Sequence, residues 1–149
     1  MRFGCFVLCR QPLSETTQNG KTSHIHGAAN FEGACDPNNV LIVSDQGKDD
    51  DVTSLAIAHE ISHAIGASHD GEGSAHSCLD IGYIMSPYMV LAANPSYSRC
   101  SIADIEKFLV EEAADCLFND TSDPQLEDQR AASCTPFLPR GEKLLRTEE

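Results

Sequence analysis

Three histidines and a glutamate stand at spacings that suit metal-assisted hydrolysis. His59 and His63 are four residues apart, so on a helix both imidazoles lie on one face and can reach one ion. Glu60 follows the first of them and would point beside the ion rather than at it. Gly66 permits a sharp left-handed turn, which would bring His69 back as a third ligand. Three neutral histidines that leave one coordination position open are typical of a catalytic zinc site.

The chemistry that this set predicts is hydrolysis of a peptide bond. Zinc lowers the pKa of a bound water from about 15.7 to near 7 and polarises a substrate carbonyl. We expect Glu60 to act as the general base toward that water and then to protonate the leaving amine. A surface helix with two incidental histidines is the competing interpretation, but Gly66 and His69 each stand where a zinc site requires them. A purely structural zinc site would have no use for Glu60 or for an open position.

Hydrophobic patterns predict the elements that would position these residues. Residues 53–65 carry an apolar stripe of helical spacing and precede Gly66, which predicts the helix that bears the first two histidines. Residues 40–43 are a β-branched apolar run and predict a buried strand. Residues 3–9 are also apolar, and a buried strand and the core of a signal peptide are the two interpretations of them. Residues 25–31 are rich in Gly and Ala and predict an extended segment.

The second half of the chain predicts less regular structure. Residues 67–99 are rich in Gly, Ser, Pro and Asn and predict a long irregular segment of the kind that carries function. Residues 101–117 predict a second helix, with Ser101 as its N-cap because an acidic residue follows three positions later. The composition changes after residue 119, so residues 120–149 are expected to form a linker or tail.

Composition excludes several classes of function. The chain has 149 residues, which suits one domain, and 23 acidic against 10 basic residues give a net charge of −13. No basic cluster is present for a nucleic-acid surface, and no apolar run approaches the roughly 18 residues of a membrane span. Seven cysteines in so short a chain point to an oxidising compartment, and we expect a secreted, extracellular protein.

The stretch AHEISHAIGASHD, residues 58–70, resembles the reprolysin (adamalysin) branch of the metzincin metallopeptidases. That branch contains the snake-venom metalloproteases and the ADAM and ADAMTS enzymes, and the compact style is most similar to proteases of tick saliva and scorpion venom. The sequence YIMSP, residues 83–87, resembles the family's Met-turn, with Met85 as an apolar floor beneath the ligands. One departure is Ser62, because that position is usually Gly in the family.

The resemblance implies an α/β (α+β) fold of metzincin type. A partial sheet and the active-site helix would lie above an irregular lower subdomain with the Met-turn and a C-terminal helix. The resemblance covers residues 25–119, which would be the C-terminal part of a truncated catalytic domain. It leaves residues 1–24 without an assigned role. It also implies zinc-dependent endopeptidase activity on an extended protein or peptide substrate, by a monomer. Asp70 would orient the loop or a ligand, although a surface turn is an equal alternative.

Further residues take their roles from the resemblance alone. An extended substrate would pair with the upper edge strand and be bounded by a wall after the Met-turn; this cleft would comprise Ile25, Gly27, Ala28, Pro87 and Tyr88. The family pattern joins Cys35 to Cys116 and Cys78 to Cys100. Cys116 and Asn119 match two positions of a calcium site whose other ligands come from further upstream, so calcium ranks behind zinc; Asn119 also begins a glycosylation sequon.

A second hypothesis belongs to another class of function. A cysteine-rich protein derived from a protease could keep zinc and its disulfides, lack activity because part of the sheet is missing, and act as a secreted binding protein. His24 and His26 are expected to form a surface pair on the substrate side, with a second metal site as the alternative.

Overall fold

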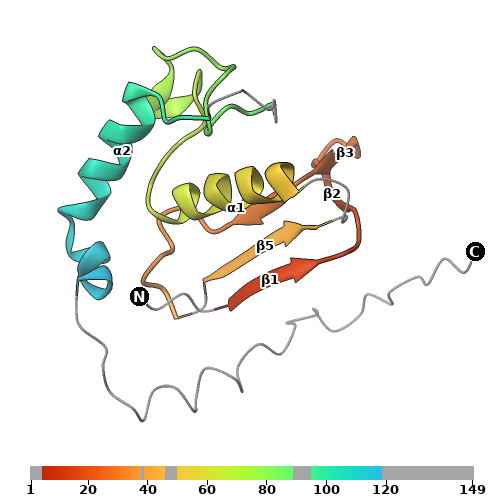
Figure 1. The fold of residues 1–149 in the computed structure, drawn as a ribbon, viewed down its shortest axis with the longest axis horizontal. Coiled ribbons are helices and arrows are strands. Elements are labelled where there is room, and N and C mark those ends of the chain that lie inside the picture. Colours follow the sequence, from red (N-terminus) through yellow and green to blue (C-terminus); the bar gives the residue numbers. More distant parts are fainter. Residues whose placement is uncertain (1–4, 38, 46–49, 89–94, 119–149) are drawn as a thin grey trace, which may run out of the picture.

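The computed structural model describes residues 5–37, 39–45, 50–88 and 95–118, which form a mixed sheet and helices. The helix α1 (Asp50–Ala64) lies between the sheet and the irregular segment that leads to α2 (Arg99–Leu109), as Figure 1 shows. This arrangement is consistent with the expected α/β class. Residues 120–149, Asn119 and residues 89–94 lie outside the described residues.

The sheet has three strands in the order β1-β5-β4. The central strand β5 (Val40–Ser44) pairs in parallel with β1 (Cys5–Cys9) and antiparallel with β4 (Gly27–Ala29). Leu41 and Val43 of β5 are buried and pack with Ala56 of α1. The predicted strand at 40–43 is confirmed by β5. Its alternate residues Leu41 and Val43 anchor α1 to the sheet.

The strand at the N-terminal end forms, but it is not buried as expected. Phe6 and Leu8 are 45% and 49% exposed. They are in register with the buried Leu41 and Val43 and therefore face the same side of the sheet. The prediction of burial was wrong because β1 is an edge strand, whereas the core forms around β5. Residues on both sides of position 24 thus contribute to one sheet.

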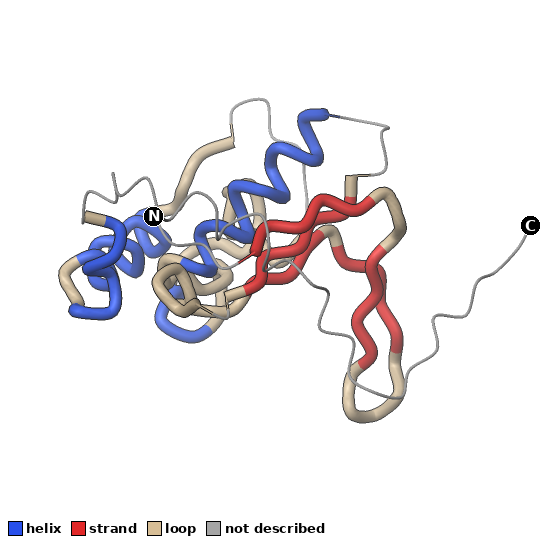
Figure 2. Tube along the Cα trace, turned by 90° about the horizontal axis from the view of Figure 1, so that it is seen from below, coloured by secondary structure: helices blue, strands red, loops and turns tan. Residues whose placement is uncertain are grey.

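A two-stranded hairpin precedes the edge strand β4. It consists of β2 (Leu13–Thr16) and β3 (Thr22–Ile25), with Gly20 at φ 80° in its turn. Figure 2 shows it projecting from the rest of the fold. The extended segment expected at 25–31 is divided at His26, whose carbonyl accepts a hydrogen bond from the Ser44 N–H. The chain therefore passes from the hairpin into the main sheet at this residue.

The helix α1 begins earlier than predicted and ends at Ala64, one residue before its predicted end. It begins at Asp50, three residues before position 53, and two aspartates in its first turn favour the positive end of the helix dipole. After Ala64 the chain turns at Gly66, whose φ of 93° suits glycine. A Cβ on Gly66 would also lie 2.8 Å from the Cβ of Phe108, so α2 packs directly against this turn.

The second helix differs from its prediction at both ends. α2 begins at Arg99 because Ser98, not Ser101, is the N-cap: the Ser98 side chain accepts a hydrogen bond from the Ser101 N–H. The helix expected to reach residue 117 stops at Leu109 and is followed by a separate short 3-10 helix, η2 (Glu112–Leu117). Between the two helices, the described residues 65–88 and 95–98 are irregular apart from η1 (Gly73–Ala75), as expected.

Two disulfides hold the lower part to the sheet and to itself. Cys35 is bonded to Cys116, and Cys78 to Cys100, which are the pairs that the family resemblance implies. Ala34, Ala64, Phe108 and Ala114 form a small core beside the first bond. No helix in the described part of the chain is long and apolar enough to cross a membrane.

Candidate metal centre and cleft

The three predicted ligands converge on one point. The Nε2 atoms of His59, His63 and His69 lie 3.1 Å apart in every pair. Nitrogens at the corners of such a triangle can all lie about 2.0–2.1 Å from a single ion. Among the described residues, this is the one group of three or more potential ligands that could hold a metal.

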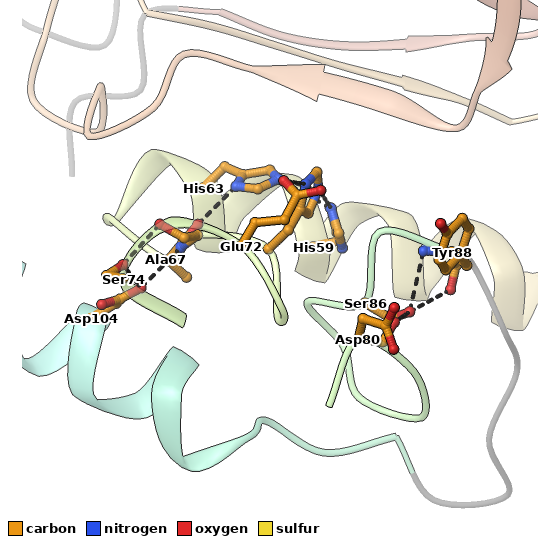
Figure 3. Close-up of polar contacts among 11 residues, drawn as sticks. His59, His63, Ala67, Glu72, Ser74, Asp80, Ser86, Tyr88 and Asp104 are labelled. Carbon is orange, nitrogen blue, oxygen red and sulfur yellow. Dashed lines mark hydrogen bonds and ion pairs between the residues drawn. The ribbon is translucent and has the colours of Figure 1, made fainter. Parts of the chain in front are cut away.

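Backbone carbonyls fix which nitrogen of each helix histidine faces the centre. His59 Nδ1 lies 2.7 Å from the Ile84 carbonyl oxygen, and His63 Nδ1 lies 2.8 Å from that of Ala67. A carbonyl only accepts, so both Nδ1 atoms carry the proton and both Nε2 atoms present lone pairs. Figure 3 shows His63 directed toward His59 and Ala67.

This donor set fits a zinc ion. Two neutral imidazoles whose Nε2 lone pairs face each other at 3.1 Å cannot hydrogen-bond to one another, and a cation between them removes the repulsion. Burial lowers the pKa of His59, and it lowers that of His63 to about 4, where the neighbouring His59 adds to the effect. Both side chains therefore remain neutral, as zinc ligands must.

The third ligand has a carboxylate behind it. His69 Nδ1 lies 3.6 Å from Glu72 Oε2. The spacing of three residues between His69 and Glu72 was the available signal, and the sequence interpretation overlooked it. It also overlooked the carbonyls of Ile84 and Ala67, which no side-chain pattern reveals.

Glu60 is a buried acid next to this centre. Glu60 is only 5% exposed, and burial raises the pKa of its carboxyl group to about 7. A carboxyl group with such a pKa can both accept and return a proton near neutral pH.

A cleft of about 690 Å³ connects the histidines with the residues expected to line it. Its walls include Ile25, Gly27, Ala28, Pro87, Tyr88, Glu60 and the three histidines. The hairpin and the residue after it add a further wall, in which His24 and His26 were expected on the substrate side, whereas Ser14 and Glu15 were not predicted. His24 and His26 are exposed on this wall, and no third ligand joins them in the described part of the chain.

The turn that contains Met85 is tied to the loop after the third histidine. Met85 is fully buried, and its carbonyl accepts a hydrogen bond from the Asp70 N–H. Asp70 is itself fully buried and accepts hydrogen bonds from the hydroxyls of Ser98 and Ser101. The surface-turn interpretation of Asp70 is therefore wrong, because its side chain ties the loop after the third histidine to the start of α2.

Two serine hydroxyls make contacts that fix the neighbouring segments. The Ser62 hydroxyl donates to the Ala58 carbonyl and lies 2.8 Å from the Tyr97 hydroxyl, which links the active-site helix to the segment before α2. Past the Met-turn, the Ser86 hydroxyl lies 2.7 Å from the Asp80 carbonyl and 2.8 Å from that of Tyr88 (Figure 3). Ser62 is thus used as a contact where the family usually has Gly.

Comparisons with known proteins find one family and several relatives. Residues 14–121 match the Reprolysin (M12B) family zinc metalloprotease. The chain is 36% identical over 112 residues to snake venom metalloproteinase atroxlysin-1 of Bothrops atrox, a match covering 73% of this chain and 52% of that protein. It is 33% identical over 94 residues to snake venom metalloproteinase fibrolase of Macrovipera lebetinus, covering 62% and 46% respectively.

A longer relative matches as well. The chain is 36% identical over 103 residues to the Mus musculus protein named "A disintegrin and metalloproteinase with thrombospondin motifs 19". The match covers 66% of this chain and 8% of that protein. The chain spans about half the length of the two venom relatives.

Proposed function

Because the chain belongs to the reprolysin (M12B) family of zinc metalloproteases, we propose that it is a metalloendopeptidase that cleaves extended polypeptides, with Glu60 as its general base. The observation that carries the proposal is the convergence of three Nε2 atoms at 3.1 Å beside a buried glutamate. His59, His63 and His69 would hold the zinc ion. Bound there, zinc supplies Lewis acidity that makes water acidic and a carbonyl electrophilic.

The protein's own groups account for the proton transfers. Glu60 accepts a proton from the attacking water and delivers it to the amine that leaves. Its burial supports this role, since a carboxyl group of pKa about 7 binds and releases protons near neutral pH. The carbonyls of Ile84 and Ala67 hold two of the imidazoles in the tautomer that the centre needs.

The substrate would lie along β4. This strand pairs with β5 on one side and lines the cleft, so an extended peptide can add to it as a further strand. Ile25, Gly27 and Ala28 would contact the peptide backbone from above, and Pro87 and Tyr88 would bound a side-chain pocket below. We infer a monomer that acts outside the cell. The two disulfides among the described residues support the extracellular location.

Two further sites remain proposals for Cys116 and for Asn119, which lies just outside the described residues. The Cys116 carbonyl and Asn119 would serve calcium, or Asn119 would carry a glycan. The inactive binding protein is not favoured, because the chain matches a zinc metalloprotease family and its three histidines could hold a metal ion.

Peptide cleavage by the zinc-loaded protein tests the proposal. We expect cleavage of a generic unfolded protein substrate that stops when a chelator removes zinc and returns when zinc is restored. Glu60→Gln should retain zinc and lose at least a hundredfold in kcat, because the proton acceptor is gone while the ligands remain. Glu106→Gln, the same change at an exposed position of α2, should match the wild type. Equal activity of Glu60→Gln and the wild type would refute the role of Glu60.

A further inference from the structure

Gly27 in the edge strand β4 lies against the side chain of Glu60. A Cβ built on Gly27 would stand 2.6 Å from Glu60 Cγ and 2.7 Å from Glu60 Oε1. It would also stand 2.8 Å from the carbonyl oxygen of Ile42 in β5. Real Cβ atoms do not approach other heavy atoms so closely, so any side chain at position 27 would force a displacement.

The need for glycine here is one of space and not of backbone conformation. Gly27 is not among the glycines with positive φ, whereas Gly66, which ends the active-site helix, is. The Ile42 oxygen belongs to the central strand and is held by strand pairing on both sides of β5. The Glu60 side chain ends in rotatable bonds, so it is the group that would yield.

We propose that Gly27 is a positioning residue, whose missing side chain keeps open the space in which the Glu60 carboxyl group reaches the cleft beside the three histidines. The proposal rests on the function proposed above for Glu60. It assigns to Gly27 a second role besides its expected contact with substrate. Any larger residue at position 27 would turn the carboxyl group away from the reacting atoms while leaving the histidines in place.

Thermal unfolding of the metal-free protein tests the contact without relying on activity. Gly27→Ala should lower Tm by roughly 5–10 °C, the usual effect of overpacking in a domain of this size. In a Glu60→Ala background, which removes both crowded Glu60 atoms, the same substitution should lower Tm by less than half as much. The difference between the two shifts measures the coupling of Gly27 with Glu60.

Gly33 provides a matched control. A Cβ there would stand 2.8 Å from Asn39 Oδ1 and 2.9 Å from two atoms of Asn30, so it is equally crowded but away from Glu60. Gly33→Ala should lower Tm equally in both backgrounds. Equal shifts for Gly27→Ala in both backgrounds would overturn the proposal, because the crowding would then come from Ile42. If Gly27→Ala fails to fold, folding of the double variant supports the proposal, and failure of both variants overturns it.

Kinetics then separate positioning from a general structural role. Zinc affinity of Gly27→Ala, measured by competition with a chelator, should stay within about threefold of the wild type, while kcat falls at least tenfold because small misplacements of a catalytic group are costly. A parallel loss of zinc affinity and kcat would contradict the assignment. If the zinc-loaded wild type cleaves no peptide, the proposed function fails, and the thermal cycle still decides whether Gly27 positions Glu60.

Discussion

Glu60 combines two properties that oppose each other in an ordinary protein interior, an ionisable group and almost complete burial. The absence of water raises its pKa to about 7, so the folded state binds its proton more tightly than the unfolded chain does. The stability that this group contributes is therefore fully present below its unfolded pKa of about 4.5 and is lost as the pH rises through about 7. In the metal-free protein, the ionised Glu60 carboxylate therefore lowers the stability of the folded state.

This cost gives a prediction for the metal-free protein. Glu60→Gln removes the ionisation, so the variant should gain stability relative to the wild type by about 2–3 kcal/mol between pH 5 and pH 8. Denaturant unfolding at several pH values measures the difference. His63, whose pKa is lowered to about 4, contributes stability that is lost as the pH falls below about 6.5, but it is present in both proteins and cancels. A difference that does not change with pH would contradict the burial argument.

The same residues show how far a sequence can predict a site. The ligands His59 and His63 follow from helical spacing, and Gly66 with His69 follows from one local turn, so all four could be predicted from neighbouring residues. The groups that orient them come from elsewhere in the fold. The Ile84 carbonyl lies 25 residues from His59 in the sequence. Every residue type has a backbone carbonyl, so the sequence does not show which one contacts the histidine.

At the scale of elements, α1 departs most from the usual amphipathic pattern. Its buried residues include Ser62 and Glu60 as well as Leu55 and Ala56. The helix is covered by the sheet on one side and by the Met-turn segment on the other, so polar side chains are buried where they make specific contacts. The existence of the helix was predictable from its stripe, whereas its earlier start at Asp50 was not, because acidic residues, Asp50 and Asp51, occupy the start of its first turn.

The start of α2 was mispredicted for a physical reason. Ser98 and Ser101 are both suitable caps in isolation, but the buried side chain of Asp70, 28 residues before Ser98, accepts hydrogen bonds from both hydroxyls. Ser98 therefore caps the Ser101 N–H and anchors Asp70 at the same time. A tertiary partner, which local sequence does not reveal, selects the cap.

Removal of this hydroxyl is predicted to be costly. Ser98→Ala deletes the cap, worth about 1 kcal/mol, and leaves a buried carboxyl group with one hydrogen bond fewer, worth about 1.5–3 kcal/mol. We expect a loss of about 2–4 kcal/mol in the free energy of unfolding, measured by denaturant titration. Ser96→Ala, the same change at an exposed position two residues earlier, should cost less than about 0.5 kcal/mol. A loss equal to that of the control would show that Asp70 has other support.

At the scale of the whole molecule, the sheet, the active-site helix and the lower segment form a small core in which alanines predominate. The cluster between α1 and α2 contains three alanines and Phe108, and the cluster on β5 adds Leu41, Val43 and Ala56. Such a core buries little apolar surface, so covalent links matter more than in larger domains. The disulfide pairing came from the family resemblance, since spacing alone leaves many pairings open. The β2–β3 hairpin was not foreseen because its residues are mostly polar and exposed.

The two disulfides should therefore contribute unequally to stability. Cys35–Cys116 joins residues 81 positions apart, whereas Cys78–Cys100 joins residues 22 apart. Loop-closure entropy gives about 4.5 kcal/mol for the first bond and about 3.4 kcal/mol for the second, against a total stability of about 5–15 kcal/mol for a typical domain. Replacing Cys35 and Cys116 together by Ala should lower the free energy of unfolding by about 1 kcal/mol more than replacing Cys78 and Cys100, measured on the metal-free proteins.

The longer bond also joins the segment after β4 to η2, so its loss should loosen the sheet from the lower part. Amide hydrogen exchange would detect this loosening as reduced protection around Ala34 and Ala114. An equal or smaller loss for the longer bond would mean that the unfolded chain already keeps these two segments together.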